Sequence, residues 1–209
     1  MRGLFITFEG PDGSGKSTQI NLLRKHLESR GYDVLFTREP GGTPISEKIR
    51  KIILDPENKG MNSVCEALLY AASRAQLVHE VIKPALESGK IVIADRFVDS
   101  SIVYQGYARG LGEDMIESIN RYAVLGEEPD VTFLITLPPE EGIKRKNRGG
   151  KLDRLEQENI LFHKKVLEGY NNIKGKYSRI VPIDGTLGID EIHHIIKDKI
   201  DFILKGGLL

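Results

Sequence analysis

Short apolar runs alternate along this chain with longer stretches in which apolar residues recur every three or four positions. A short continuous apolar run is typical of a buried strand, and a recurrence of three to four is typical of one helix face. The runs predict strands at residues 4–8, 33–37, 91–94, 131–135 and 179–183. The periodic stretches predict helices after residue 16, over 45–53, from 63, over 115–123, from 139, from about 153 and over 189–203.

Several helix ends carry recognisable signals. Ser63 and Glu66 have capping-box spacing at the start of a long helix, and Pro84 is expected to end or kink that helix, because proline lacks an N–H and clashes with the preceding turn. Asp153 and Glu156 repeat the capping-box spacing before a helix that is expected to run to about residue 177.

Strands alternate with helices throughout, which predicts one α/β domain with a parallel five-stranded sheet covered by helices on both faces, a three-layer fold. The 209 residues suit one such domain, and no internal repeat or low-complexity segment interrupts it. In sheets of this kind, ligands bind at the carboxyl ends of the strands. The chemistry is therefore expected just after the predicted strands.

A phosphate-binding motif follows the first strand directly. Gly10 to Ser17 fits Gly-x-x-x-x-Gly-Lys-[Ser/Thr], between a predicted strand and a predicted helix. Glycines let backbone N–H groups turn inward around phosphate oxygens, and the helix N-terminus adds a positive dipole end. Lys16 can reach the outer phosphates, and the Ser17 hydroxyl can bind Mg²⁺. The predicted nucleoside-triphosphate site consists of Gly10, Pro11, Asp12, Gly13, Ser14, Gly15, Lys16, Ser17 and Thr18.

Two further strand ends carry charged residues. Arg38 follows the second predicted strand beside a Pro-Gly-Gly turn, where it can fork onto a phosphate, although a surface arginine in a turn would look the same. Asp95 and Arg96 follow the third strand, where Asp95 can hold Mg²⁺ or its water and Arg96 can bind phosphate. The alternative for this pair is a structural ion pair. Tyr70 and Arg74 share one helix face, and Tyr70 is alternatively a core residue.

Composition excludes several classes. Thirty basic residues balance thirty acidic ones, which disfavours a general nucleic-acid or membrane-surface binder. Cys65 is the one cysteine, so no internal disulfide forms, as expected of a cytoplasmic protein. No signal pattern or membrane-length apolar run is seen, and the five histidines lack metal-ligand spacing. A GTPase is disfavoured, because Asn58-Lys59 is not followed by the x-Asp of a guanine-reading segment.

With these motifs in place, the chain resembles the thymidylate kinases, P-loop enzymes of the nucleoside-monophosphate-kinase type. The resemblance runs from near Met1 to the last helix. It rests on segments in family order at residues 9–18, 38–43, 68–74, 95–106 and 148–156. It implies transfer of the γ-phosphoryl group of ATP to dTMP with Mg²⁺, which Ser17 and Asp95 would bind. It also implies a cytoplasmic homodimer formed through helices, for which the helix from Ser63 is a candidate.

The resemblance also implies roles for individual residues. Asp12 would orient the acceptor phosphate or a metal-bound water, with Lys16 and Arg96 as further catalytic groups. Arg38 and Arg96 would hold the monophosphate. The remaining dTMP contacts would be Tyr70 stacked on thymine, Arg74 and Ser101 at the base, and Tyr104 and Gln105 along the sugar and base. Residues 183–186 would lie near adenine.

A basic, glycine-containing stretch at residues 144–151 suits a mobile lid over ATP, reaching to about residue 154. The phosphate loop contains no arginine, and the bacterial-type enzymes of this family carry lid arginines instead. Arg148 is the expected transition-state arginine, with Arg145 and Arg154 as rivals that also contact ATP. A solvated basic loop or a small nucleic-acid patch remains the alternative.

Two other functions stay open. Another nucleoside-monophosphate kinase, or a deoxynucleoside kinase that recruits Glu9 or Asp12 as general base, would share most of these motifs. A nucleotide-binding regulatory module would share the phosphate loop without phosphoryl transfer.

Overall fold

The computed structural model describes residues 2–146 and 152–207. Its centre is a five-stranded sheet in which all neighbouring strands are parallel, in the order β2-β3-β1-β4-β5. The strands are β1 (Phe5–Glu9), β2 (Val34–Arg38), β3 (Ile91–Asp95), β4 (Val131–Thr136) and β5 (Ile180–Asp184). The predicted three-layer α/β fold and all five predicted strands are confirmed.

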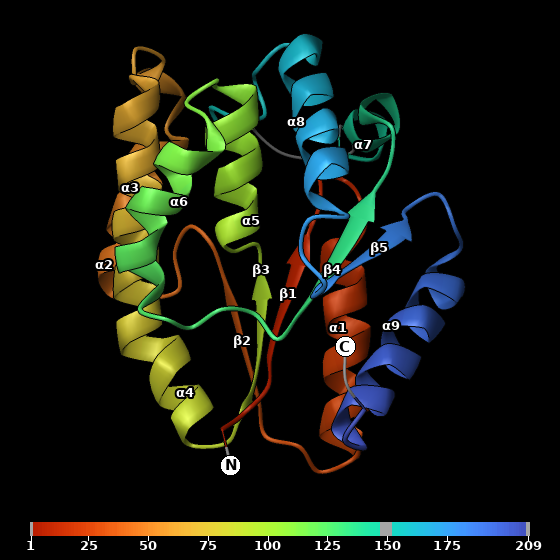
Figure 1. Cartoon of the computed structure of the whole chain (residues 1–209). Helices are drawn as coiled ribbons and strands as arrows, with labels where there is room; N and C mark the ends of the chain where they lie inside the picture. Colours follow the sequence, from red (N-terminus) through yellow and green to blue (C-terminus); the bar gives the residue numbers. More distant parts are fainter. Residues whose placement is uncertain (1, 147–151, 208–209) are drawn as a thin grey trace.

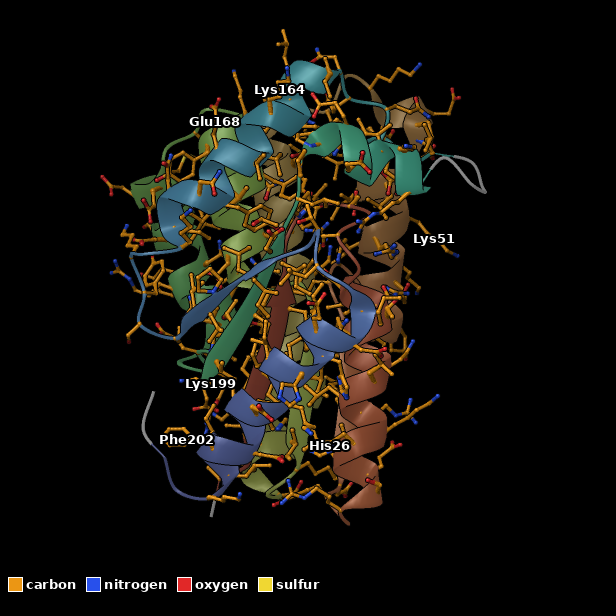
Figure 2. The ribbon with its side chains drawn as sticks, turned by 90° about the vertical axis from the view of Figure 1, so that its right-hand side faces the viewer. His26, Lys51, Lys164, Glu168, Lys199 and Phe202 are labelled. Carbon is orange, nitrogen blue, oxygen red and sulfur yellow. The ribbon has the colours of Figure 1, made fainter. Side chains whose placement is uncertain are left out.

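Helices cover both faces of this sheet (Figure 1). On one face, α1 (Lys16–Ser29) and α9 (Ile189–Leu204) pack side by side, as Figure 2 also shows, and their apolar sides join one core cluster with β1 and β3–β5. The other helices are α2 (Pro44–Leu54), α3 (Ser63–Leu77), α4 (Lys83–Glu87), α5 (Val98–Ser101), α6 (Glu113–Val124), α7 (Pro139–Lys146) and α8 (Ile160–Ile173). Two further clusters bury α3, α4, α6 and α8 against the opposite face.

The three inner strands explain why the sequence pattern was so clear. In β1 every residue is buried, and in β3 and β4 all but the last residue of each strand is buried, because helices cover both faces. The edge strands are more exposed, with one buried residue of five in β2 and two of five in β5. The carboxyl ends of β1, β3 and β4 point to the end of the molecule where α7 and α8 lie (Figure 1).

The helix from residue 63 differs from the prediction at its start. Asn62 caps it, accepting a hydrogen bond from the Val64 N–H at 2.8 Å. Glu66 is fully buried and binds side chains of other segments, so the predicted capping box of Ser63 and Glu66 is wrong. Near Pro84 the chain stays helical, with a π-helical turn, η2 (Val78–Ile82), leading into α4. A wider, π-helical turn is one way for a helix to accommodate a proline, which has no N–H to donate.

Two other segments depart from the sequence pattern. Residues 98–108 form α5 and a π-helical stretch, η3 (Ile102–Ala108), which the periodicity did not indicate. Asp153 and Glu156 do form reciprocal hydrogen bonds of 2.9 Å through their backbone N–H groups. They cap only a turn, and α8 begins later, at Ile160, with Asn159 as its N-cap. Within the residues that the structure describes, no helix has both the length and the apolar character needed to span a bilayer.

Candidate active site

The carboxyl ends of β1, β2 and β3 open into a cleft of about 820 Å³. It is lined by residues of the phosphate loop, by the ends of β2 and β3, by α3, α5 and η3, and by the starts of α1 and α9. Segments far apart in the sequence thus meet at one place, as the parallel topology requires.

The phosphate loop depends on glycine at two close approaches. At Gly10, where φ is 136°, a Cβ atom would lie 2.0 Å from the carbonyl oxygen of Ile135. At Gly13, where φ is 77°, it would lie 2.3 Å from the carbonyl oxygen of Gly142 on α7. Glycine adopts such positive φ angles at little cost, and only a residue without Cβ leaves this space. The loop is therefore held against both β4 and α7.

Lys16 lies inside this loop. Its Nζ donates hydrogen bonds to the carbonyl oxygens of Gly10 at 2.9 Å and Pro11 at 3.0 Å. Burial and the nearby charge of Arg96 lower the pKa of Lys16 to about 8. A polyanion in the cleft would offset both effects, because an opposite charge favours the ammonium form.

Ser17 and Asp95 lie together beside the loop, where the Ser17 hydroxyl donates to Asp95 Oδ2 at 3.4 Å. A hydroxyl and a carboxylate are the oxygen donors that Mg²⁺ prefers, and Mg²⁺ in phosphate sites takes few protein ligands and completes its shell from phosphates and water. Among the described residues no cluster of three or more His, Cys, Asp or Glu side chains suits a metal. This pair therefore fits a phosphate-bound Mg²⁺.

Arg96 lies between the phosphate loop and the other half of the cleft. One nitrogen, Nη2, donates to Asp12 Oδ1 at 2.8 Å, and Nη1 donates to Ser100 Oγ and Tyr170 Oη at 3.1 Å each. Its guanidinium carbon lies 5.2 Å from the ring centre of Tyr104. Its backbone φ is 71°, a left-handed conformation that residues other than glycine rarely adopt. Such strain persists where the surroundings fix it, often at functional sites.

Glu9 is fully buried at the end of β1 and has a structural role that was not predicted from the sequence. Its carboxylate accepts hydrogen bonds from the backbone N–H of Phe97 at 2.7 Å, from the Ser100 hydroxyl at 2.6 Å and from Tyr170 Oη at 3.1 Å. Burial and the nearby charge of Asp99 raise the pKa of Glu9 to about 7. The signal available in the sequence was a carboxylate that directly precedes the phosphate loop and follows a largely apolar strand. Nothing in the sequence indicated Tyr170.

One end of the cleft contains most of the residues predicted to bind the acceptor, and we call it the acceptor side. The predicted residues that line it are Arg38, Tyr70, Arg96, Ser101, Tyr104 and Gln105. Arg38 donates to the carbonyl oxygen of Pro40 at 3.0 Å and pairs with Glu47 at 3.0 Å. Arg50, not predicted, also lines the cleft and donates to the same Pro40 oxygen at 2.8 Å. Two arginines therefore converge at this end.

Arg74 lies beneath the wall rather than in it. The side chain is 1% exposed and bonds to both carboxylate oxygens of Glu39, to Asn120 and to the carbonyl oxygen of Phe97. Its Nη1 also donates to Ser101 Oγ at 3.2 Å. The geometry thus places Arg74 behind Ser101, as the support of a residue that reaches the cleft.

The arginines predicted for the lid do not share one environment. Arg145 lines the cleft, and its Nη1 donates to the carbonyl oxygen of Gly185 at 3.2 Å. Arg154 is buried, 6% exposed, and bound to Glu66 and to the carbonyl oxygen of Ile53 near the end of α2. Arg148 and residues 147–151 lie outside the described part of the chain.

The opposite end of the cleft is more apolar. Leu187, Ile189 and Ile192 line it together with Gly185 and Gly188, close to the segment at 183–186 that is predicted to lie near adenine. Gln19 closes this end from α1, its Nε2 donating to the carbonyl oxygen of Ile189 at 2.8 Å. The cleft therefore has two ends separated by a cationic centre around Lys16 and Arg96. This arrangement suits two phosphorylated molecules, one at each end, whose phosphate groups face each other at the centre.

Comparisons with known proteins agree with this geometry. A family model described as thymidylate kinase matches residues 8–196. The chain is 53% identical to a thymidylate kinase of Caldanaerobacter subterraneus over 208 residues, 99% of each chain. It is 51% identical to one of Halothermothrix orenii over 215 residues, 100% of each. The crystal structure of a thymidylate kinase from Ehrlichia chaffeensis superposes with a TM-score of 0.77 at 35% identity, covering 96% of this chain and 99% of that one.

Proposed function

This chain belongs to the thymidylate kinase family, and we propose that its cleft transfers the γ-phosphoryl group of ATP to dTMP, giving dTDP and ADP. The observation that carries this proposal is the position of Arg96. It bonds to Asp12 of the phosphate loop on one side and lies over the Tyr104 ring of the acceptor side on the other. One cation therefore faces both the donor phosphates and the acceptor monophosphate.

The reaction needs charge neutralisation more than acid–base chemistry. The attacking oxygen of dTMP is already anionic, and the transferred group spreads negative charge over its oxygens. Lys16 would bind the outer phosphates of ATP, while Arg38 and Arg96 would bind the phosphate of dTMP. Asp12 would keep the Arg96 guanidinium in line with the transferred group. Holding the two polyanions in line lowers the barrier by orientation and electrostatic stabilisation.

Mg²⁺ would be held by Ser17 and Asp95 together with the phosphates of ATP, and it would supply positive charge to the oxygens that bridge the donor phosphates. The two side chains lie side by side, with Ser17 Oγ 3.4 Å from Asp95 Oδ2, which supports this assignment.

The acceptor base would stack on Tyr70, with Ser101 and Gln105 near its polar edge and Tyr104 beside the sugar. Burial raises the pKa of the Tyr70 and Tyr104 hydroxyls, so both rings are neutral and suited to stacking or to hydrogen bonding. Adenine would occupy the apolar end near Ile189 and Ile192. Arg145 would contact ATP, and Arg148 is proposed as the transition-state arginine of a lid at residues 144–154.

We further propose that residues 1–209 act as one catalytic domain in the cytoplasm, as a homodimer. Support for the dimer comes from apolar side chains on the adjoining helices α3 and α6, where Leu68 is 51% exposed and Tyr122 is 78% exposed. Leu68→Glu should reduce the mass measured by light scattering from dimer to monomer. Leu161→Glu, at a site on α8 that is 65% exposed, is the matched control and should leave the mass unchanged.

A coupled ADP-release assay with dTMP, dUMP, CMP, UMP and AMP as acceptors tests the activity. We expect turnover with dTMP to exceed turnover with CMP, UMP and AMP by orders of magnitude, and to require Mg²⁺. Turnover with CMP or AMP in place of dTMP would refute the acceptor assignment. No ADP release with any acceptor would refute the kinase.

A further inference from the structure

A buried carboxylate connects two walls of the acceptor side. Glu66, on α3, has no exposed surface. Its Oε1 accepts from Gln105 Nε2 at 2.9 Å, and its Oε2 lies 2.7 Å from Arg154 Nη2. Arg109 also reaches both oxygens, at 3.3 and 3.1 Å. The Glu66 side chain therefore binds one residue within η3, one directly after η3 and one in the segment before α8.

One of these partners is itself part of the cleft. Gln105 lines the acceptor end, and its side chain is 1% exposed. A buried amide whose Nε2 is fixed by a carboxylate cannot rotate without losing that bond, and an unpaired buried carboxylate is costly. Glu66 thus fixes which part of the Gln105 amide faces the cleft.

The second partner holds the opposite wall. Arg154 Nε donates to the carbonyl oxygen of Ile53 at 2.7 Å, and the Arg154 backbone N–H donates to the carbonyl oxygen of Leu54 at 3.0 Å. Leu54 lines the cleft, as do Asp153 and Leu155 on either side of Arg154. Arg154 therefore fastens the turn at residues 153–156 to the end of α2, and Glu66 neutralises the arginine that does so.

The charge balance favours an ionised Glu66. Burial raises the pKa of its carboxyl, and hydrogen bonds from Gln105 and Arg109 with the charge of Arg109 more than offset this, so that its pKa lies below the ordinary value. Arg109 has a second partner, Glu158, at 2.6 Å, and its guanidinium carbon lies 4.5 Å from the ring centre of Phe162. Arg109 lines no part of the cleft, which makes it a useful control.

We propose that Glu66 is a positioning residue for the acceptor nucleotide, which sets the Gln105 amide on one wall and, through Arg154, the turn at 153–156 on the other. This inference rests on the proposed function, because it assumes that the acceptor binds between these walls. It also assigns Arg154 to the acceptor side rather than to ATP, in contrast to the expectation from the sequence.

Steady-state kinetics of Arg154→Gln and Arg109→Gln test the assignment. Each variant removes one cation from Glu66, so both should unfold at a lower temperature. Only Arg154→Gln frees the turn at residues 153–156 from the end of α2. We expect the KM of this variant for dTMP to rise about tenfold or more, with KM for ATP within about twofold of wild type. Arg109→Gln should keep both KM values within about twofold of wild type. Arg154→Lys keeps the charge and is the substitute if Arg154→Gln fails to fold.

A double-mutant cycle tests the role of Glu66 itself. Gln105→Ala and Arg154→Gln lie on different walls, and if Glu66 joins them, their effects on KM for dTMP should be non-additive by about threefold or more. The same pair of substitutions made in a Glu66→Gln background should be additive, because the shared partner is gone.

The outcomes separate cleanly. A rise in KM for ATP with Arg154→Gln, equal kinetic effects of Arg154→Gln and Arg109→Gln, or an additive cycle in the wild-type background would overturn the inference and leave the kinase intact. A wild-type protein that does not phosphorylate dTMP would refute the proposed function, and the inference with it.

Discussion

The guanidinium of Arg96 lies 2.8 Å from the carboxylate of Asp12, across 84 residues of sequence. The contact links the end of β3 to the phosphate loop and aims the remaining Arg96 donors at Ser100 and Tyr170. An arginine held on three sides by fixed partners needs little rearrangement when phosphates arrive, which is the property that electrostatic catalysis requires.

Loss of the Arg96 side chain should remove most of the activity. We expect Arg96→Ala to lower kcat by roughly 100- to 1000-fold, the usual cost of losing one well-placed donor to the transition state. Arg96→Lys keeps the charge but cannot bond to Asp12, Ser100 and Tyr170 at the same time. Its kcat should therefore lie between the kcat of the wild type and that of Arg96→Ala. Stopped assays with saturating dTMP and ATP measure this. A change in kcat of less than threefold in Arg96→Ala would contradict the assigned role.

The backbone of Arg96 should reveal strain when the side chain is gone. At φ 71° an alanine is strained and a glycine is not. The free energy of unfolding of Arg96→Gly should therefore be about 1 kcal/mol higher than that of Arg96→Ala, although both variants should lack activity. Urea titration followed by circular dichroism compares them. Equal stabilities would mean that the left-handed conformation is not kept in solution.

Glu9 should make stability fall as the pH rises. Its pKa is raised to about 7 in the folded state, above the usual value of a carboxyl, so between these two pH values the folded chain binds more protons than the unfolded one. The stabilisation present at low pH is lost as the pH passes through 7. From pH 5 to pH 8 the Glu9 contribution should fall by roughly 2–3 kcal/mol.

Glu9→Gln isolates this contribution. The amide can still accept from the Phe97 N–H and can donate to the Ser100 or Tyr170 hydroxyl, so the fold should be kept. Denaturant titrations at pH 5, 6.5 and 8 should show a smaller loss of stability for the variant than for the wild type. Parallel curves for the two proteins would show that Glu9 titrates normally.

Lys16 should take up a proton when ATP binds at mildly alkaline pH. Its pKa of about 8 in the free protein leaves it about half protonated at pH 8, and bound phosphates restore the charged form. Calorimetry of ATP binding in buffers with different ionisation enthalpies should give an uptake of about half a proton. Lys16→Arg is fully protonated at this pH and should bind without uptake. Equal uptake by both proteins would refute the assignment.

The contact between α7 and the phosphate loop should not tolerate a methyl group. A Cβ at Gly142 would lie 2.5 Å from the carbonyl oxygen of Asp12. We expect Gly142→Ala to destabilise the protein by about 1–3 kcal/mol and to raise KM for ATP, because the loop must shift. Gly175→Ala, where a Cβ meets no atom within 4 Å, is the matched control. Normal kinetics for Gly142→Ala would show that α7 yields freely.

What the sequence could predict depended on local signals. The phosphate loop and the strand ends at Arg38 and Asp95 are set by neighbouring residues and by the rule that ligands meet at the carboxyl ends of parallel strands. The destinations of Arg74 and Arg154 could not be found in this way. Both are long side chains whose partners, Glu39 and Glu66, lie far away in sequence, and burial alone decided where each points.

Glu66 illustrates the same limit at a helix start. Its spacing from Ser63 matched a capping box, but Asn62 supplies the cap. Glu66 turns into the protein, where it accepts hydrogen bonds from Gln105 and Arg109 and pairs with Arg154. A local pattern competes with every tertiary contact available, and a buried charge with several partners outweighs a cap of about 1 kcal/mol.

The cage around Glu9 has a consequence for biosynthesis. The carboxylate belongs to the first strand to leave the ribosome, whereas the Tyr170 hydroxyl that closes the cage arrives with α8, 161 residues later. A nascent chain that lacks α8 exposes an ionisable group where the finished protein buries one. Final assembly of the cleft therefore has to wait until most of the polypeptide has been translated.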